Sequence, residues 1–343
     1  MTETRSSTNL SDLESSTSTL RGRDLGSLVA ASFCCAMSLL DTNVMALASP
    51  VIADAMGADS AGARWVISAF FLGFASSLLP AGAISDRNGR RRVLLWGLGA
   101  LALTSLLAGC AFSMALLIWT RAAQGVAMAF VLAPALALIG HRFHEPEARA
   151  RAWMLWGSIM GLTMVVAPFL GGLIVQWTGW RGAFLLNLPI CAGLALAIRD
   201  LATESGDRDR DPPDFPAILC FAAMMFCLTW VLITGPLAGW SSAGVLGVGG
   251  IGMVALAALV LRTRTSKAAD EPPLYRQPRL VGAVLAMFAY AATAQVMASL
   301  LPVGFQVLAG SNPAQIGLLV LPFTSAMLIF PQIGAMFSAR IGV

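Results

Sequence analysis

The sequence predicts an all-α polytopic membrane protein with about ten transmembrane helices. Of its 343 residues, 57% are hydrophobic and only 12% are charged, and the mean hydropathy is +0.76. A soluble domain carries charge on about a quarter of its residues, so the apolar segments of this chain must face lipid. Each segment must be a helix, because lipid offers the backbone no hydrogen-bond partner and the segments are too long for barrel strands.

Apolar runs recur along the chain at close to the length of about 20 residues that crosses roughly 30 Å of hydrocarbon. They predict transmembrane helices at residues 27–49, 63–84, 93–112, 114–139, 153–176, 182–198, 216–235, 241–261, 280–308 and 314–338. Glycines at several positions in 241–261 are compatible with a dimer face or with packing inside the molecule, and packing is the favoured reading. The sequence leaves the oligomeric state open.

Two polar linkers that mix charge with proline lie at residues 200–215 and 263–279. Such composition is typical of connections between groups of helices. The linkers divide the chain into a six-helix bundle at 25–199, an inserted helix pair at 216–262, and the first two helices of an incomplete bundle at 280–343.

The basic residues predict the orientation of the chain. All but three of its 22 Lys and Arg residues fall in residues 1–24 or in loops on the same side, the exceptions being Arg64, Arg121 and Arg181. The positive-inside rule therefore predicts a multi-pass protein of the cytoplasmic membrane with its N-terminus in the cytoplasm. Residues 1–24 are rich in Ser and Thr and lack an apolar core, so we expect a disordered cytoplasmic tail and not a signal peptide.

The most specific motif is the loop after the second predicted helix, where residues 82–92 read Gly-Ala-Ile-Ser-Asp-Arg-Asn-Gly-Arg-Arg-Arg. Gly82 permits a close helix approach, Gly89 permits a tight turn, and Asp86 lies among arginines with which it can pair. An ordinary basic loop would not need this spacing. The segment resembles the signature GxxxDRxGRR of the major facilitator superfamily. The resemblance implies a cytoplasmic gating motif formed by Gly82, Asp86, Arg87, Gly89, Arg90 and Arg91.

Other segments are similar to motifs of the fourteen-helix drug:proton antiporters of that superfamily. They lie at residues 40–50, 121–129, 167–172, 180–189 and 306–322. A fourteen-helix member has six helices, an inserted pair and six more. The resemblance therefore implies a chain truncated at its C-terminus, with four helices missing.

The segment at 167–172 resembles the antiporter motif GPxxGG of the fifth helix. Its residues Pro168, Gly171 and Gly172 predict a kink and a close-packing site, and the resemblance implies a role in limiting ion leakage.

Asp41 is the one acidic residue placed deep within a predicted span. At a rise of 1.5 Å per residue it lies about 9 Å below the outer edge of the hydrocarbon, and Arg121 lies about 10 Å deep. An unpaired ion there costs at least about 2.5 kcal/mol, so we expect the two side chains to face a shared aqueous cavity and to pair or compete for a proton. The functional interpretation is that Asp41 alternates between a proton and a cationic substrate, and the alternative is a static pair that fixes helix packing.

Three glutamines are further candidates for the site. Gln124 lies one turn from Arg121, and Gln295 and Gln306 lie in the predicted span 280–308. Each is compatible with a substrate contact or with a hydrogen bond to a neighbouring helix, and the sequence does not separate the two.

Several chemistries lack a basis in the sequence. It contains no phosphate-binding GxxxxGK[ST] segment and no cluster of nucleophile, base and orienting group, so we expect neither ATP-driven transport nor an enzyme. The segment His141-x-x-His144-Glu145 lacks further ligands, and we expect no metal and no cofactor.

The hypothesis that remains is a proton-coupled secondary transporter that exports lipophilic or cationic drugs by alternating access. Its expected partners are a small-molecule substrate (an organic cation or drug), protons and the lipid bilayer, with no nucleic acid. The alternatives are an exporter of one metabolite or antibiotic and a membrane fragment that does not transport.

Overall fold

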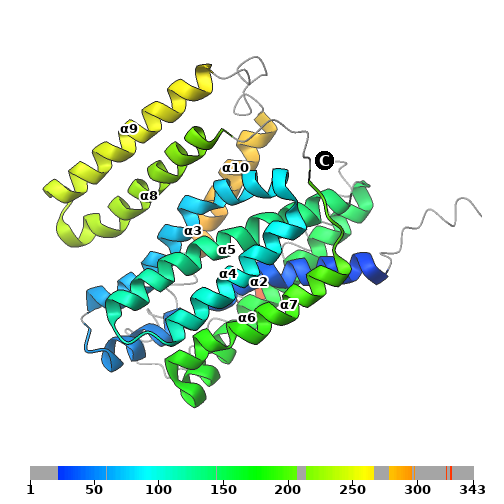
Figure 1. Ribbon diagram of the computed structural model, residues 1–343, viewed down its shortest axis with the longest axis horizontal. Coiled ribbons are helices and arrows are strands. Elements are labelled where there is room, and N and C mark those ends of the chain that lie inside the picture. The colour runs from blue at the N-terminus through cyan, green and yellow to red at the C-terminus, as the bar shows by residue number, and fades with distance from the viewer. Residues whose placement is uncertain are drawn as a thin grey trace, which may run out of the picture.

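The computed structural model describes residues 22–58, 60–143, 145–206, 214–265 and 278–295, together with 297, 322, 325 and 326. All regular secondary structure within these residues is helical (Figure 1). Seven of the helices in the described part are long and apolar enough to cross a membrane. The all-α membrane fold expected from the sequence is confirmed.

The first six helices form one bundle. They are α2 (Gly22–Ala55), α3 (Ser60–Asn88), α4 (Arg90–Gly109), α5 (Met114–Arg142), α6 (Pro146–Leu185) and α7 (Asn187–Leu201). Helix α5 packs against α2, α3 and α4, while α6 packs mainly on α2 and α7 mainly on α4. The long axes of these helices run side by side in Figure 1. A residue on the inner face of α5 can therefore contact several helices at once.

Helix α6 contains parts of two predicted spans. Its 40 residues are interrupted at Gly179, whose φ of 70° and ψ of 179° leave the helical region. Glycine tolerates this positive φ because it has no Cβ. The break falls in the gap between the predicted spans 153–176 and 182–198, and the second span continues into α7. Pro168 lies inside α6, whereas the residue whose backbone leaves the helical region is Gly179. The kink at Pro168 stays a prediction.

Glycines bring α3, α4 and α5 into backbone contact. A Cβ at Gly125 would overlap the carbonyl oxygen of Phe70, and one at Gly73 would overlap the carbonyl oxygen of Ala122. Gly97 faces α5 in the same way. Where two backbones approach this closely, no larger residue fits, and van der Waals contact along the helices stabilises the packing. These contacts fix the depth at which the polar side chains of α5 meet those of α2 and α4.

The helices extend beyond the apolar runs that predicted them. Helix α2 begins at Gly22, inside the expected tail, and α5 continues to Arg142. The polar headgroup regions widen a bilayer of about 30 Å to about 40–45 Å, so a helix can add a polar turn at either end. The boundary errors therefore fall at the ends of the helices, where hydropathy no longer marks the backbone conformation.

Helices α8 (Phe215–Ala238) and α9 (Ala243–Thr265) form an antiparallel pair at one side of the bundle (Figure 1). They pack on each other, and α8 also packs on α3. Helix α10 (Pro278–Tyr290) continues into a π-helix at Ala291–Gln295. These two elements cover the beginning of the predicted span 280–308, whereas the predicted span 314–338 lies almost wholly outside the described residues.

Candidate functional site

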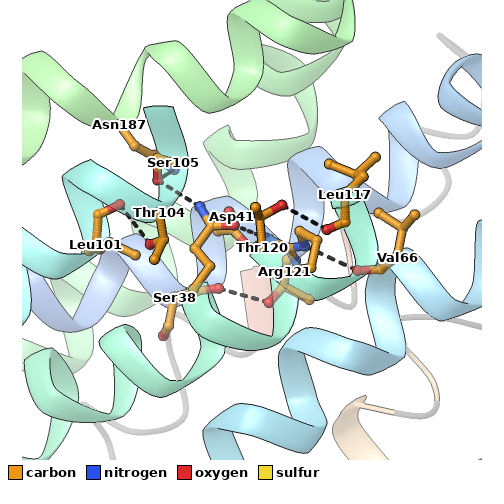
Figure 2. A network of polar contacts seen from close by, with 12 residues as sticks. Ser38, Asp41, Val66, Leu101, Thr104, Ser105, Leu117, Thr120, Arg121 and Asn187 are labelled. Carbon is orange, nitrogen blue, oxygen red and sulfur yellow. Dashed lines mark hydrogen bonds and ion pairs between the residues drawn. The ribbon is translucent and has the colours of Figure 1, made fainter. Parts of the chain in front are cut away.

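A buried ion pair joins α2 and α5 inside the bundle. The Nη1 atom of Arg121 donates to Oδ2 of Asp41 at 2.8 Å, and the side chains are only 1% and 3% exposed, respectively. The Nε atom of Arg121 donates to the backbone carbonyl of Val66 in α3 at 3.1 Å. Figure 2 shows these contacts converging on the guanidinium group. The arginine thus connects three helices through a single side chain.

The matching depths of Asp41 and Arg121 in the sequence correctly predicted that they could meet. The expected exposure to an aqueous cavity is wrong for this structure, because both side chains are enclosed by the bundle. The physical reason is that residues of neighbouring helices pack around the pair: the carbonyl of Val66 and the rings of Phe70 and Phe184 surround the guanidinium. The charge is stabilised instead by protein groups.

A chain of hydrogen bonds extends from the ion pair to α4 and α7. Arg121 Nη1 also donates to Oε1 of Gln124 at 2.7 Å, and Gln124 Nε2 donates to the hydroxyl of Ser105 at 2.7 Å. The amide of Asn187 donates to the same hydroxyl at 3.2 Å. All of these side chains are buried, and buried polar groups are costly unless they are paired. The network is shown in Figure 2.

Two aromatic rings enclose the guanidinium group. Its Cζ atom lies 4.6 Å from the ring centroid of Phe70 and 5.8 Å from that of Phe184. The electron-rich face of an aromatic ring attracts a cation, and the attraction is strongest where water is absent. The ion pair is thus hydrogen-bonded to polar side chains on one side and packed against two aromatic rings on the other.

Sequence reasoning missed Ser105 as a site residue and gave Asn187 no specific role. Ser105 lies within the apolar run 93–112, where a single hydroxyl is common and carries little signal. Its importance comes from the contact between α4 and α5, which spacing along one helix cannot reveal. Asn187 stands alone in an apolar segment at the start of α7, and that isolation is the signal that could have marked it.

The signature loop lies between α3 and α4. Asp86 accepts two hydrogen bonds from Arg90, with a shortest distance of 2.8 Å. Gly89 has a φ of 100°, so the tight turn expected there is present. Arg87 lies in the last turn of α3. Among the residues that the structure describes, no helix approaches Gly82 closely, because a Cβ there would have no neighbour within 4 Å.

The helix-5 motif contributes one close contact. A Cβ at Gly171 would lie 3.2 Å from the Cα of Val44, which places α6 against α2 close to the ion pair. At Gly172 a Cβ would meet open space, so only the first glycine of the motif is required by packing.

The other candidates are described less fully. Gln295 ends the π-helix that follows α10, and Gln306 and His144 lie outside the described residues. In the part of the chain that the structure describes, no group of three or more His, Cys, Asp or Glu side chains is arranged to hold a metal ion.

The described helices and the polar network enclosed between them place the chain among the polytopic helical membrane proteins. The sequence profile of the Major Facilitator Superfamily matches residues 31–343. The chain belongs to this superfamily.

Its relatives include exporters from actinomycetes. The chain is 30% identical over 329 residues to the tetracenomycin C resistance and export protein of Streptomyces glaucescens, covering 94% of this chain and 60% of the relative. It is 32% identical over 308 residues to the methylenomycin A resistance protein of Streptomyces coelicolor, covering 88% and 64%. The multidrug resistance protein Stp of Mycobacterium tuberculosis is 30% identical over 307 residues, with 89% and 57% covered. The chain therefore spans about 60% of the length of these relatives.

Solved structures show the same fold. A crystal structure of a peptide transporter POT in complex with sulfate has a TM-score of 0.60 and 15% sequence identity, and the match covers 92% of this chain and 69% of that chain. At this identity the similarity shows the fold alone.

Proposed function

We propose that the chain is part of a proton-coupled secondary transporter that exports lipophilic or cationic drugs by alternating access. The observation that carries this proposal is the Asp41–Arg121 pair, a carboxylate and a guanidinium joined at 2.8 Å with both side chains buried inside the bundle. Ionisable residues within a membrane are costly and mark ion or substrate pathways. The names of the relatives, which include a multidrug resistance protein and an export protein, support the same direction.

The geometry suggests how the coupling works. Protonation of Asp41 removes its negative charge and weakens its contact with Arg121. Arg121 then keeps two neutral partners, the side-chain oxygen of Gln124 and the carbonyl of Val66. The guanidinium therefore stays hydrogen-bonded in both protonation states, and the cost of separating the pair is reduced. Asp41 binds the proton in the outward-open state and the cationic substrate in the inward-open state.

The proposed orientation follows the basic residues. The positive-inside rule places the N-terminus, the signature loop and the ends of α5 and α7 in the cytoplasm. Arg91, Arg142 and Arg199 all lie at that end of the bundle. Substrate is therefore released outside the cell when the bundle opens at the end opposite to these arginines. The signature loop, with Asp86, Arg87, Gly89, Arg90 and Arg91, is proposed as the gating motif of the cytoplasmic side.

A second candidate is an exporter of one antibiotic or metabolite. It is favoured by relatives named for single compounds, among them the cephamycin export protein of Amycolatopsis lactamdurans, 33% identical over 299 residues. Competition for ethidium export by unrelated cations supports the multidrug function. Competition by one chemical class only supports the single-substrate function.

The test is ethidium efflux from an efflux-deficient bacterium that expresses the chain. We expect efflux that an uncoupler abolishes and that Asp41→Asn reduces to the rate of cells without the protein. Asp54→Asn is the matched control, because Asp54 is an exposed acid near the end of the same helix, and it should leave the rate unchanged. Uncoupler-sensitive efflux that persists in Asp41→Asn would contradict the role of this residue.

A further inference from the structure

The segment after α7 folds back onto the signature loop. Residues 202–206, here called the strap, have no regular secondary structure and follow the end of α7. The sequence predicted a polar linker at 200–215 between two groups of helices. In the structure, the strap lies against Gly89 and the first turn of α4, more than 110 residues away in the chain.

The strap supplies the hydrogen-bond acceptors that the start of α4 lacks. The first backbone N–H groups of a helix have no partner within the helix. Here the N–H of Arg90 donates to the carbonyl of Ser205 at 2.9 Å. The N–H groups of Arg91 and Arg92 donate to the two carboxylate oxygens of Glu204 at 3.1 and 3.2 Å. The Gly89 position that precedes α4 makes no side-chain cap of its own, so Glu204 provides the cap from a distance.

The steric fit between the strap and the loop is close. A Cβ at Gly89 would lie 2.6 Å from Oε1 of Glu204, and a Cβ at Gly206 would lie 2.8 Å from the Cα of Gly89. Glycine is therefore required at position 89 for two reasons: the positive φ, and the space that the Glu204 side chain occupies. Arg91 adds a further contact between α4 and the end of α7, because its guanidinium donates to the carbonyl of Arg199 at 2.7 Å.

These contacts join the end of α7 to the turn that carries the gating motif. Since Arg90 both begins α4 and pairs with Asp86, the position of that pair depends on how the start of α4 is held. The negative charge of Glu204 is also favourable at the positive end of the helix dipole. A change at Glu204 therefore acts on the Asp86–Arg90 pair through α4.

We propose that Glu204 is a positioning residue for the signature loop: its carboxylate caps α4 and holds the loop and the end of α7 together as one unit. The consequence for transport rests on the proposed function. The cap of α4 by Glu204 does not rest on the proposed function, and it can be measured independently of transport.

The first measurement is backbone hydrogen exchange of the full chain, purified in detergent, over the peptide that contains residues 90–92. Glu204→Ala should accelerate exchange there by about tenfold or more and leave peptides of α5 unchanged, because the cap protects only the first turn of α4. Gly206→Ala keeps the carboxylate but pushes the strap away from Gly89, so it should give the same local acceleration. Glu147→Ala is the matched control. The Glu147 side chain is 87% exposed, and its ion pair with Arg151 is long, at 3.4 Å. This substitution should have no effect on exchange at residues 90–92.

The second measurement is the kinetics of ethidium efflux. Glu204→Ala should lower the maximal rate several-fold with little change in the half-saturating concentration, because the loop does not contact substrate. Glu204→Gln, which keeps one acceptor oxygen, should fall between Glu204→Ala and the unchanged chain. Unchanged protection of residues 90–92 in Glu204→Ala overturns the inference, whatever the efflux result. Absence of efflux in the unchanged chain would count against the proposed function and leave the exchange result standing.

Discussion

The six-helix bundle and the α8–α9 pair are both apolar enough to span a membrane, but they differ in how their residues are held. In the most apolar 18-residue stretch of α5, 50% of the residues are buried, whereas the corresponding stretches of α8 and α9 have 6% buried. The bundle encloses its polar side chains at its centre. The pair has its main ion pair, Asp214 with Arg262, at its polar end.

The difference shows that hydropathy alone does not say what surrounds a membrane helix. A residue of α5 is constrained by backbone contacts and hydrogen bonds to three neighbours, so its identity is specific. A residue of α8 or α9 mostly contacts no other residue of the part that the structure describes, so many apolar side chains should be equivalent there. Substitutions should therefore be costly in the bundle and mild in the pair, and the following predictions test this contrast.

The largest effect is expected at Arg121. Arg121→Gln leaves Asp41 buried without its ionic partner, and breaking a buried pair in this way costs about 3–5 kcal/mol. We expect a large fall in the thermal unfolding temperature of the chain in detergent. Arg149→Gln, at an exposed position, should leave that temperature unchanged. The double variant Asp41→Asn/Arg121→Gln should be more stable than Arg121→Gln alone, because it leaves no uncompensated charge. A double variant as unstable as the single one would argue against the ion pair as the cause.

An intermediate effect is expected from glycine substitutions. Gly125→Ala places a Cβ against the carbonyl oxygen of Phe70, and forcing α3 and α5 apart should cost about 1–3 kcal/mol. Gly250→Ala in α9 meets open space and should change stability by less than about 0.5 kcal/mol. Thermal unfolding of the two variants measures the contrast directly. Equal losses would show that the pair is packed as tightly as the bundle.

The sequence predicted the class of fold, because long apolar runs can only be helices in lipid. It also predicted that Asp41 and Arg121 could meet, since depth in a membrane follows from counting residues along a helix. It missed Ser105 and the strap, because both depend on contacts between helices far apart in the chain. The expected aqueous cavity around the ion pair was wrong for the same reason: the groups that surround Arg121, among them Phe70 and Phe184, come from other helices.

The smallest effect is expected at the ion pair that closes the α8–α9 hairpin. Asp214 precedes the membrane span, and the guanidinium of Arg262, followed by the backbone N–H of Ala217, lowers the pKa of its carboxyl below the ordinary value of 3.8. A carboxyl with a lowered pKa contributes stability above its ordinary pKa and loses that contribution as the pH falls through its folded value. Asp214→Asn should therefore lower the unfolding temperature slightly at pH 7.

The difference between Asp214→Asn and the unchanged chain should shrink as the pH falls from 3.8 through the lower pKa of the folded protein, where the unchanged carboxyl also becomes protonated. Scanning fluorimetry at pH 7, 5 and 3 measures this dependence. In an Arg262→Gln background, the same substitution should have a smaller effect at pH 7, since the largest cause of the lowered pKa is gone. The pair is thus expected to respond to pH at its polar end, while its helices tolerate substitution. A pH-independent difference would contradict a contribution from the charge of Asp214, because asparagine keeps the oxygen that caps α8.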